Sequence, residues 1–183
     1  VAFDGAPPSF ERLSGAAAGS FEIVENPRFL PRARLVASAE IEPDDGRALA
    51  RLQDPGFPRE QGVVLAAGEA RAAGPAAAGS ARIVRDRPDA VDVAIEPAAP
   101  GWLVLADTFF PGWVARVDGQ PREILPANVA FRAVAVQPGD KEVEFRYEPL
   151  SYRAGAIVSV LAAGLLAVSC VLSLRRRAAH DAP

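Results

Sequence analysis

The longest hydrophobic stretch lies near the C-terminus, where the 21 residues from Ala154 to Leu174 carry no charge. At 1.5 Å per residue, a helix of this length spans about 31 Å, close to the hydrocarbon thickness of a bilayer. Arg153 precedes the stretch and Arg175–Arg177 follow it. A buried core helix is the alternative interpretation, but a core helix this long normally has a polar face. The pattern predicts a single transmembrane helix over residues 151–174.

The arginine triplet predicts how this helix is oriented. Positive charges favour the cytoplasmic side of a membrane, which places residues 175–183 in the cytoplasm and residues 1–152 outside. Tyr152 stands where an interfacial aromatic anchor is expected. The stretch is C-terminal, so it is not a signal peptide. We therefore expect a cell-membrane protein with an extracytoplasmic domain and membrane lipid as a partner.

Upstream of the apolar stretch, apolar and polar residues alternate in short segments. Val143, Phe145 and Tyr147, for example, alternate with charged residues, and Asp118-Gly119 is a strong hairpin signal. Short strands separated by turns at about 8–12 residues are typical of an antiparallel β-sandwich or a partly open barrel. The strands are expected near residues 20–25, 32–39, 63–65, 81–85, 91–95, 102–106, 113–117, 122–125, 129–135 and 143–147.

One short helix interrupts the strands. Asp44 is a plausible N-cap, and Ala48, Leu49 and Leu52 would line one face of the helix. The helix should end before Asp54-Pro55-Gly56. The sequence thus predicts a mainly β domain over residues 20–150 with one helix.

Two segments have no clear period. Residues 1–19 are rich in Pro, Gly and Ala and indicate a linker or loop from an upstream region. Residues 68–80 are low in complexity and indicate a flexible excursion. Because the first residue is Val rather than Met, we expect a processed chain or a fragment of a longer one.

Composition excludes several classes of function. A net charge of −3 argues against a nucleic-acid partner, and one Cys excludes a disulfide framework and a Cys-rich zinc site. The single His180 lies in the predicted cytoplasmic tail, so the domain cannot build a Ser–His or Cys–His pair. Neither Asp44-Asp45 nor the aspartates at 86–92 match a calcium loop. We predict no catalytic residue, metal or cofactor here, although a carboxylate pair of the glycosidase kind stays open.

The segment from Asp107 to Trp113 carries the best candidate chemistry. Pro111 and Gly112 suit a type II turn, which needs a positive φ at its third position. Asp107 could accept hydrogen bonds from sugar hydroxyls, while Phe110 and Trp113 could stack on the sugar. We therefore name these three residues as a candidate substrate-binding site. The alternative is structural: Phe110 and Trp113 fill the core and Asp107 caps the loop.

Three arginines lie on the polar phase of consecutive strands, Arg116, Arg132 and Arg146. They could form a basic stripe that faces lipid phosphates or a lipid-linked pyrophosphate. Intervening glutamates favour a solvated, ion-paired face instead. The sequence leaves both interpretations open.

Several short motifs occur in a fixed order along the chain. They are Glu25-Asn26-Pro27, Leu30-Pro31-Arg32-Ala33, Asp107, Pro111-Gly112-Trp113, Val117-Asp118-Gly119, Pro138-Gly139 and Tyr147-Glu148-Pro149. Together with the membrane helix that follows, this series resembles the C-terminal region of the YfhO-like family of bacterial membrane proteins. The resemblance covers roughly residues 22–174, with residues 54–80 poorly matched.

The resemblance implies a function. Members of this family are long, polytopic proteins similar to the GT-C class of lipid-phosphosugar-dependent glycosyltransferases, whose catalytic acidic residues lie in an early extracytoplasmic loop. This chain would then be an accessory domain and the last membrane helix of an enzyme of cell-envelope glycan assembly. Its partners would be the other membrane helices and a glycan or lipid-linked sugar. The alternative is a stand-alone, membrane-anchored β-sandwich that binds carbohydrate or protein without catalysis.

Overall fold

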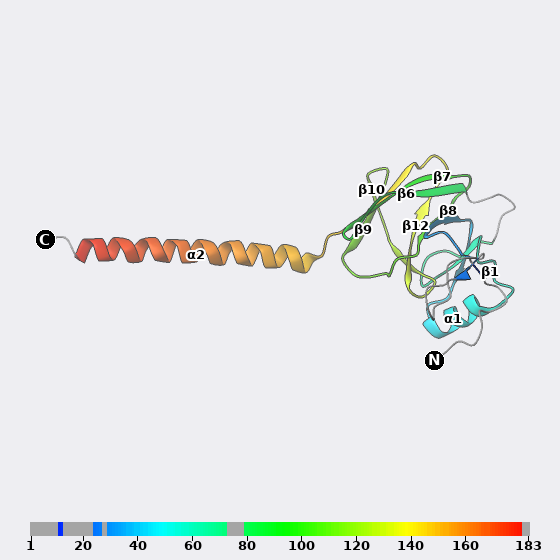
Figure 1. Cartoon of the computed structure of the whole chain (residues 1–183), viewed down its shortest axis with the longest axis horizontal. Coiled ribbons are helices and arrows are strands. Elements are labelled where there is room, and N and C mark those ends of the chain that lie inside the picture. The colour runs from blue at the N-terminus through cyan, green and yellow to red at the C-terminus, as the bar shows by residue number, and fades with distance from the viewer. Residues whose placement is uncertain (1–10, 13–23, 27–28, 73–78, 181–183) are drawn as a thin grey trace.

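The computed structural model describes residues 11–12, 24–26, 29–72 and 79–180. Two β-sheets pack face to face, and a long helix leaves them at the C-terminal end (Figure 1). The predicted fold class, a mainly antiparallel β-sandwich with one short helix and a C-terminal apolar helix, is confirmed. Most of residues 1–19 and of the expected strand at 20–25 lie outside the described residues, as do residues 73–78 and 181–183.

The five-stranded sheet is antiparallel throughout, with the order β10-β9-β13-β7-β6. The C-terminal strand lies at its centre, between two strands that come earlier in the chain. The bounds are β6 Gly79–Arg87, β7 Ala90–Pro97, β9 Trp113–Val117, β10 Gln120–Arg122 and β13 Glu142–Tyr147.

The six-stranded sheet has the order β3-β8-β12-β11-β5-β4. Its strands are β3 Ala33–Val36, β4 Ser38–Ile41, β5 Gly62–Leu65, β8 Gly101–Leu105, β11 Leu125–Ala127 and β12 Phe131–Val136. The pair β4–β5 is parallel, unlike the expected antiparallel pattern. The helix α1 (Asp45–Gln53) connects these two strands and supplies the crossover that a parallel pair requires. A separate two-stranded ladder joins β1 (Glu11–Arg12) to β2 (Val24–Glu25).

The main core lies between the sheets. Alternation correctly predicts that Val143 and Phe145 point inward, since both are fully buried. The other large members of this cluster are Leu35, Val91, Val93, Ile95, Leu103, Leu105, Val117, Val134 and Val136. A second cluster, which includes Trp102 and Leu65, covers the other face of the six-stranded sheet. Central strands such as β8 are therefore buried on both faces.

Helix α1 begins and ends where the sequence predicts. The Asp44 carboxylate accepts a hydrogen bond from the backbone N–H of Arg47 at 2.9 Å, and the helix ends at Gln53. Ala48 and Leu52 pack with Phe57 against the six-stranded sheet. The expectation for Leu49 is wrong, because this side chain is half exposed. At 100° per residue, Leu49 lies a quarter turn away from the stripe that Ala48 and Leu52 form.

Glu40 and Arg51 tie α1 to strand β4. Arg51 donates to both carboxylate oxygens of Glu40, at 2.7 and 2.8 Å, and this hydrogen bonding lowers the pKa of Glu40. A lowered carboxylate pKa adds stability above the unfolded-state pKa of about 4.3, and this stability is lost as the pH falls through the folded-state value.

We expect Glu40→Gln to lower the free energy of unfolding by less than about 1 kcal/mol at neutral pH, because both side chains of the pair stay partly exposed to water, which weakens their attraction. Chemical unfolding of the full chain and of the variant, measured over a pH series, checks this. The difference between the two should shrink once the pH falls below the range in which Glu40 is ionised. A difference that stays constant through this acid range would contradict the assignment.

The C-terminal helix α2 extends from Leu150 to His180. Its segment Leu150–Ser169 is long and apolar enough to cross a membrane, and none of it is buried against the rest of the protein. Figure 1 shows α2 as a single rod that leaves the sandwich beside β9. The helix continues through Arg175–Arg177, past the predicted end at residue 174. Its orientation across a membrane stays a prediction.

Candidate functional site

The end of the sandwich from which α2 leaves, here called the α2 end, gathers loops from distant parts of the chain. The backbone N–H of Tyr147, the last residue of β13, donates to the carbonyl of Asp89 in the β6–β7 turn at 2.9 Å. The next N–H, of Glu148, donates to the carbonyl of Gly112 at 2.7 Å. Gly112 has a φ of 101°, as the predicted type II turn requires. The loop before β9, the β6–β7 turn and the start of α2 are thus held together.

Two arginines and two aspartates form a cluster at this end. Arg32 grips Asp107 with two hydrogen bonds, from Nε to Oδ1 at 2.7 Å and from Nη2 to Oδ2 at 2.9 Å. Its Nη1 also donates to Asp86 at 2.6 Å. Arg132 reaches the same Oδ2 of Asp107 at 3.4 Å. We call Arg32, Asp86, Asp107 and Arg132 the arginine–carboxylate cluster.

Arg132 is the least usual member, because only 3% of its surface is exposed. Among the described residues, its Nε and Nη1 have no hydrogen-bond partner. Its guanidinium carbon lies 4.0 Å from the centre of the Trp113 ring and 5.8 Å from that of Phe145. Burial lowers the pKa of Arg132, and the charge of Asp107 opposes that effect. Asp107 and two aromatic faces therefore compensate this buried charge.

Arg32 is held more firmly than Arg132. Its hydrogen bond to Asp107 raises the pKa of Arg32, and the bond to Asp86 adds to the rise. Arg32 thus occupies both oxygens of Asp107 and leaves Arg132 the longer contact. The positive charge of Arg132 is the less completely paired of the two.

The three residues predicted to bind a sugar do not form one surface. Asp107 and Trp113 lie together around Arg132, but Phe110 is 57% exposed and packs on Tyr147, with ring centres 6.5 Å apart. Trp113 packs against the main core, as in the structural alternative, and Tyr147 lies 5.5 Å from its ring. Both oxygens of Asp107 already accept hydrogen bonds. A sugar site at these three residues stays a prediction.

A shallow cavity of about 430 Å³ opens beside the cluster. Besides the cluster, Arg87, Pro88, Val91 and Trp113 line it. Guanidinium groups, carboxylates and one indole are groups that bind hydroxylated or anionic ligands. The sequence did not single out Arg87 or Arg132 for this cavity. Arg32 stood out only through its Leu-Pro-Arg-Ala motif and Asp86 only through its neighbouring aspartates.

Of the two interpretations that the sequence left open for Arg116, Arg132 and Arg146, the basic stripe does not form. Arg116 pairs with Glu148 at 3.5 Å, whereas Arg146 pairs with Asp92 and, at 2.9 Å, with Glu144. Arg132 belongs to the other sheet and is buried. The ion-paired alternative is therefore the one that the structure shows for Arg116 and Arg146.

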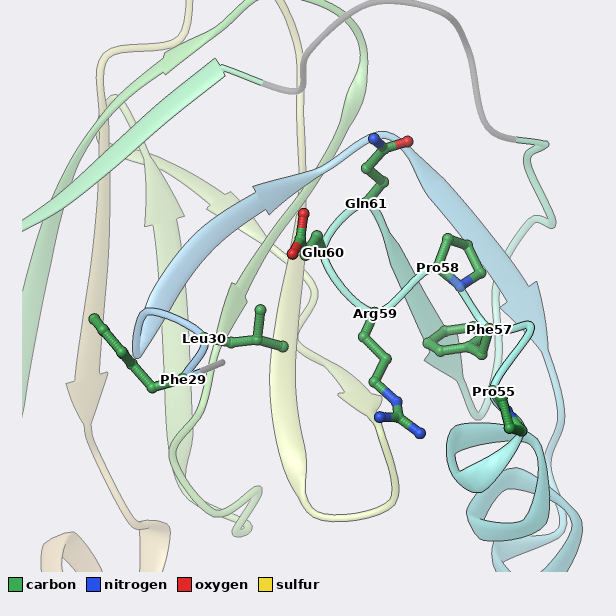
Figure 2. Close-up of a pocket in the computed structure, with 8 residues that line it drawn as sticks. All are labelled: Phe29, Leu30, Pro55, Phe57, Pro58, Arg59, Glu60 and Gln61. Atoms are coloured by element: carbon green, nitrogen blue, oxygen red, sulfur yellow. The ribbon is translucent and has the colours of Figure 1, made fainter. Parts of the chain in front are cut away.

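A second cavity, of about 480 Å³, lies beside α1. Figure 2 shows Phe29 and Leu30 on one side of the opening, and Pro55, Phe57 and Arg59 on the other. Arg59 donates to the carbonyl of Leu52 at 3.2 Å. No residue that the sequence singled out as a site lines this cavity.

Within the described part of the chain, no group of three or more His, Cys, Asp or Glu side chains is arranged to hold a metal ion. Comparison of the chain with family models, curated proteins and solved structures found no match. The proposals below therefore depend on the geometry and on the motif series.

Proposed function

We propose that this chain is the extracytoplasmic accessory domain and last membrane helix of a YfhO-like bacterial membrane protein. The whole protein would be a lipid-phosphosugar-dependent glycosyltransferase of cell-envelope glycan assembly, with its catalytic residues outside this segment. The observation that carries the proposal is the junction between the sandwich and α2. Only Glu148 and Pro149 separate β13 from α2, and Glu148 is bonded to Gly112. A sandwich so tied cannot move far from a membrane that α2 crosses.

The motifs that carry the resemblance also meet in space, which supports the proposal. Arg32, from Leu-Pro-Arg-Ala, grips Asp107, which lies 75 residues later and begins the Asp-x-x-x-Pro-Gly-Trp motif. Trp113, at the end of that motif, contacts Tyr147 of the Tyr-x-Pro motif. Three separate motifs thus build one end of the sandwich, the end that faces α2.

The cavity at the α2 end suits a role in positioning substrate. Its guanidinium groups can form charge-assisted hydrogen bonds to a sugar phosphate, and the cavity opens at the end of the sandwich from which α2 leaves. The same cavity also favours the alternative, a stand-alone membrane-anchored module that binds carbohydrate. The two proposals differ in whether other membrane helices complete the protein.

Labelling of engineered cysteines tests the orientation. With Cys170 replaced by Ser, a cysteine at exposed Ser80 should react with an impermeant maleimide in right-side-out vesicles. A cysteine at position 178, in the predicted cytoplasmic tail, should react only in inside-out vesicles. The reverse pattern would contradict the proposed orientation.

Arg87→Gln tests the substrate role. Arg87 lines the cavity and is exposed, so its loss should leave the fold intact. A charge-assisted hydrogen bond of about 1.5 kcal/mol corresponds to roughly a tenfold effect. We expect about a tenfold loss of sugar transfer from lipid-linked donor in membranes that carry the variant.

Arg82→Gln is the matched control, because Arg82 is exposed on the same strand but does not line this cavity. It should retain normal transfer. Equal activity of both variants would contradict a role for the cavity. Binding of glycan by the purified chain alone, without any transfer in membranes, would favour the stand-alone module.

A further inference from the structure

Exposed aromatic side chains gather at the α2 end. Among the residues whose side chains the structure describes, five aromatics are exposed, and four of them lie here: Phe109, Phe110, Tyr147 and Tyr152. Phe110 is 57% exposed and Tyr152 76%. Leu150, the first residue of α2, is also exposed. Large apolar side chains that share one exposed surface indicate an interaction site.

This surface is fixed relative to the start of α2. The bond from Glu148 to the carbonyl of Gly112 joins the loop of Phe109 and Phe110 to the junction. The fit is close, since a Cβ atom added at Gly112 would lie 3.0 Å from the Tyr147 ring and 3.2 Å from Pro149. The Phe110 and Tyr147 rings are also in contact. The loop of Phe109 and Phe110 is therefore held in a fixed position relative to the first turn of α2.

The segment able to cross a membrane begins at Leu150, immediately after this junction. The aromatic side chains thus lie at the level where α2 would enter a bilayer. Phe109 and Phe110 come from the loop before β9, Tyr147 from the end of β13 and Tyr152 from α2 itself. Tyr and Trp are enriched in this interfacial layer because they combine an apolar ring with a polar group, and Phe109 and Phe110 add apolar rings beside the two tyrosines.

We propose that Phe109, Phe110, Tyr147 and Tyr152 form an aromatic collar that inserts into the interfacial layer of the leaflet that α2 enters. The collar binds lipid, and it holds the α2 end of the sandwich against the headgroups. The inference rests on the proposed function only in that α2 crosses a membrane. Lipid is the occupant because the collar continues directly from the segment that would lie in the bilayer.

Spin labels on the full chain test the collar. The chain, with Cys170 replaced by Ser, is reconstituted into vesicles of phosphatidylcholine and phosphatidylglycerol. One label is placed at Phe110→Cys and a control label at Ser80→Cys, at the far end of β6. At about 3.3 Å per residue, Ser80 lies roughly 20 Å along β6 from the turn at the α2 end. A third label at Leu161→Cys reports whether α2 is embedded.

The label at position 110 should be accessible to oxygen, which concentrates in lipid, and protected from a water-soluble nickel complex. The label at position 80 should show the opposite. If position 110 is as accessible to nickel as position 80 while position 161 stays protected, the collar is overturned and the membrane helix stands. Protection of position 110 from both reagents would indicate a second copy of the chain as occupant and would also overturn it. Nickel access at position 161 would overturn the membrane helix and the collar together.

Discussion

Replacing Asp107 with Ala should lower the free energy of unfolding by about 3 kcal/mol, because it leaves a buried charge without its partner. Arg132 is 3% exposed, and Asp107 is the carboxylate that its guanidinium reaches. Arg32 also loses its two hydrogen bonds to Asp107, although it is exposed enough to find water. Denaturant unfolding of the full chain in detergent, followed by tryptophan fluorescence, measures the loss. Trp113 stacks on Arg132 and reports directly on this end of the sandwich.

Two further variants test the stated cause. Asp86→Ala removes the other aspartate of the cluster, but Asp86 is more than half exposed, so the cost should be below about 1 kcal/mol. Adding Arg132→Met to Asp107→Ala should restore most of the lost stability, because the apolar residue removes the unpaired charge. Equal costs for the two aspartates would contradict the argument, as would a double variant no more stable than Asp107→Ala.

Local signals predicted most of the elements. The Asp118-Gly119 hairpin forms with φ values of 46° and 79°, which Asp tolerates and Gly favours. Asp44 caps α1 as its position before the helix suggests. Each of these features depends on residues only a few positions apart, so a single sequence contains the whole signal.

Strand pairing and phase in the six-stranded sheet were less predictable. The expected strand over residues 32–39 divides at Ala37 into β3 and β4, which lie at opposite edges of the sheet. Alternation shows which side chains share a face, but it does not show which strand lies alongside. The parallel β4–β5 pair depends on the crossover through α1. The sequence pattern predicts this helix, but it does not predict that the strands on either side of it pair at the edge of the sheet.

The site shows the same limit more sharply. The sequence identified Asp107 and Trp113 as candidate site residues. Their partners come from other parts of the chain, since Arg32 directly precedes β3 and Arg132 lies in β12. The charge of Arg132 suggested that it lies on a polar face. However, β12 is an interior strand of the six-stranded sheet, and most of its side chains are buried on both faces. A buried arginine becomes tolerable only when a carboxylate and aromatic rings from elsewhere surround it. Because these partners are far from Arg132 in the sequence, a local pattern does not reveal them.

Gly112→Ala should lower the free energy of unfolding by about 3 kcal/mol through two separate effects. The φ of 101° disfavours any side chain, at a cost of about 1–2 kcal/mol. The new methyl group would also lie 3.0 Å from the Tyr147 ring and 3.2 Å from Pro149 Cβ, a crowding that typically costs about 1–3 kcal/mol. Unfolding of the full chain in detergent measures the sum.

Gly139→Ala separates the two effects. Gly139 has almost the same φ, 99°, but an added Cβ would meet nothing within 4 Å. Its substitution should therefore cost only the backbone strain, about 1–2 kcal/mol. The excess cost at Gly112 measures how tightly the loop fits against Tyr147 and Pro149. If both variants cost the same, the loop can yield, and the sandwich is then less firmly tied to α2 than the bond from Glu148 to Gly112 indicates.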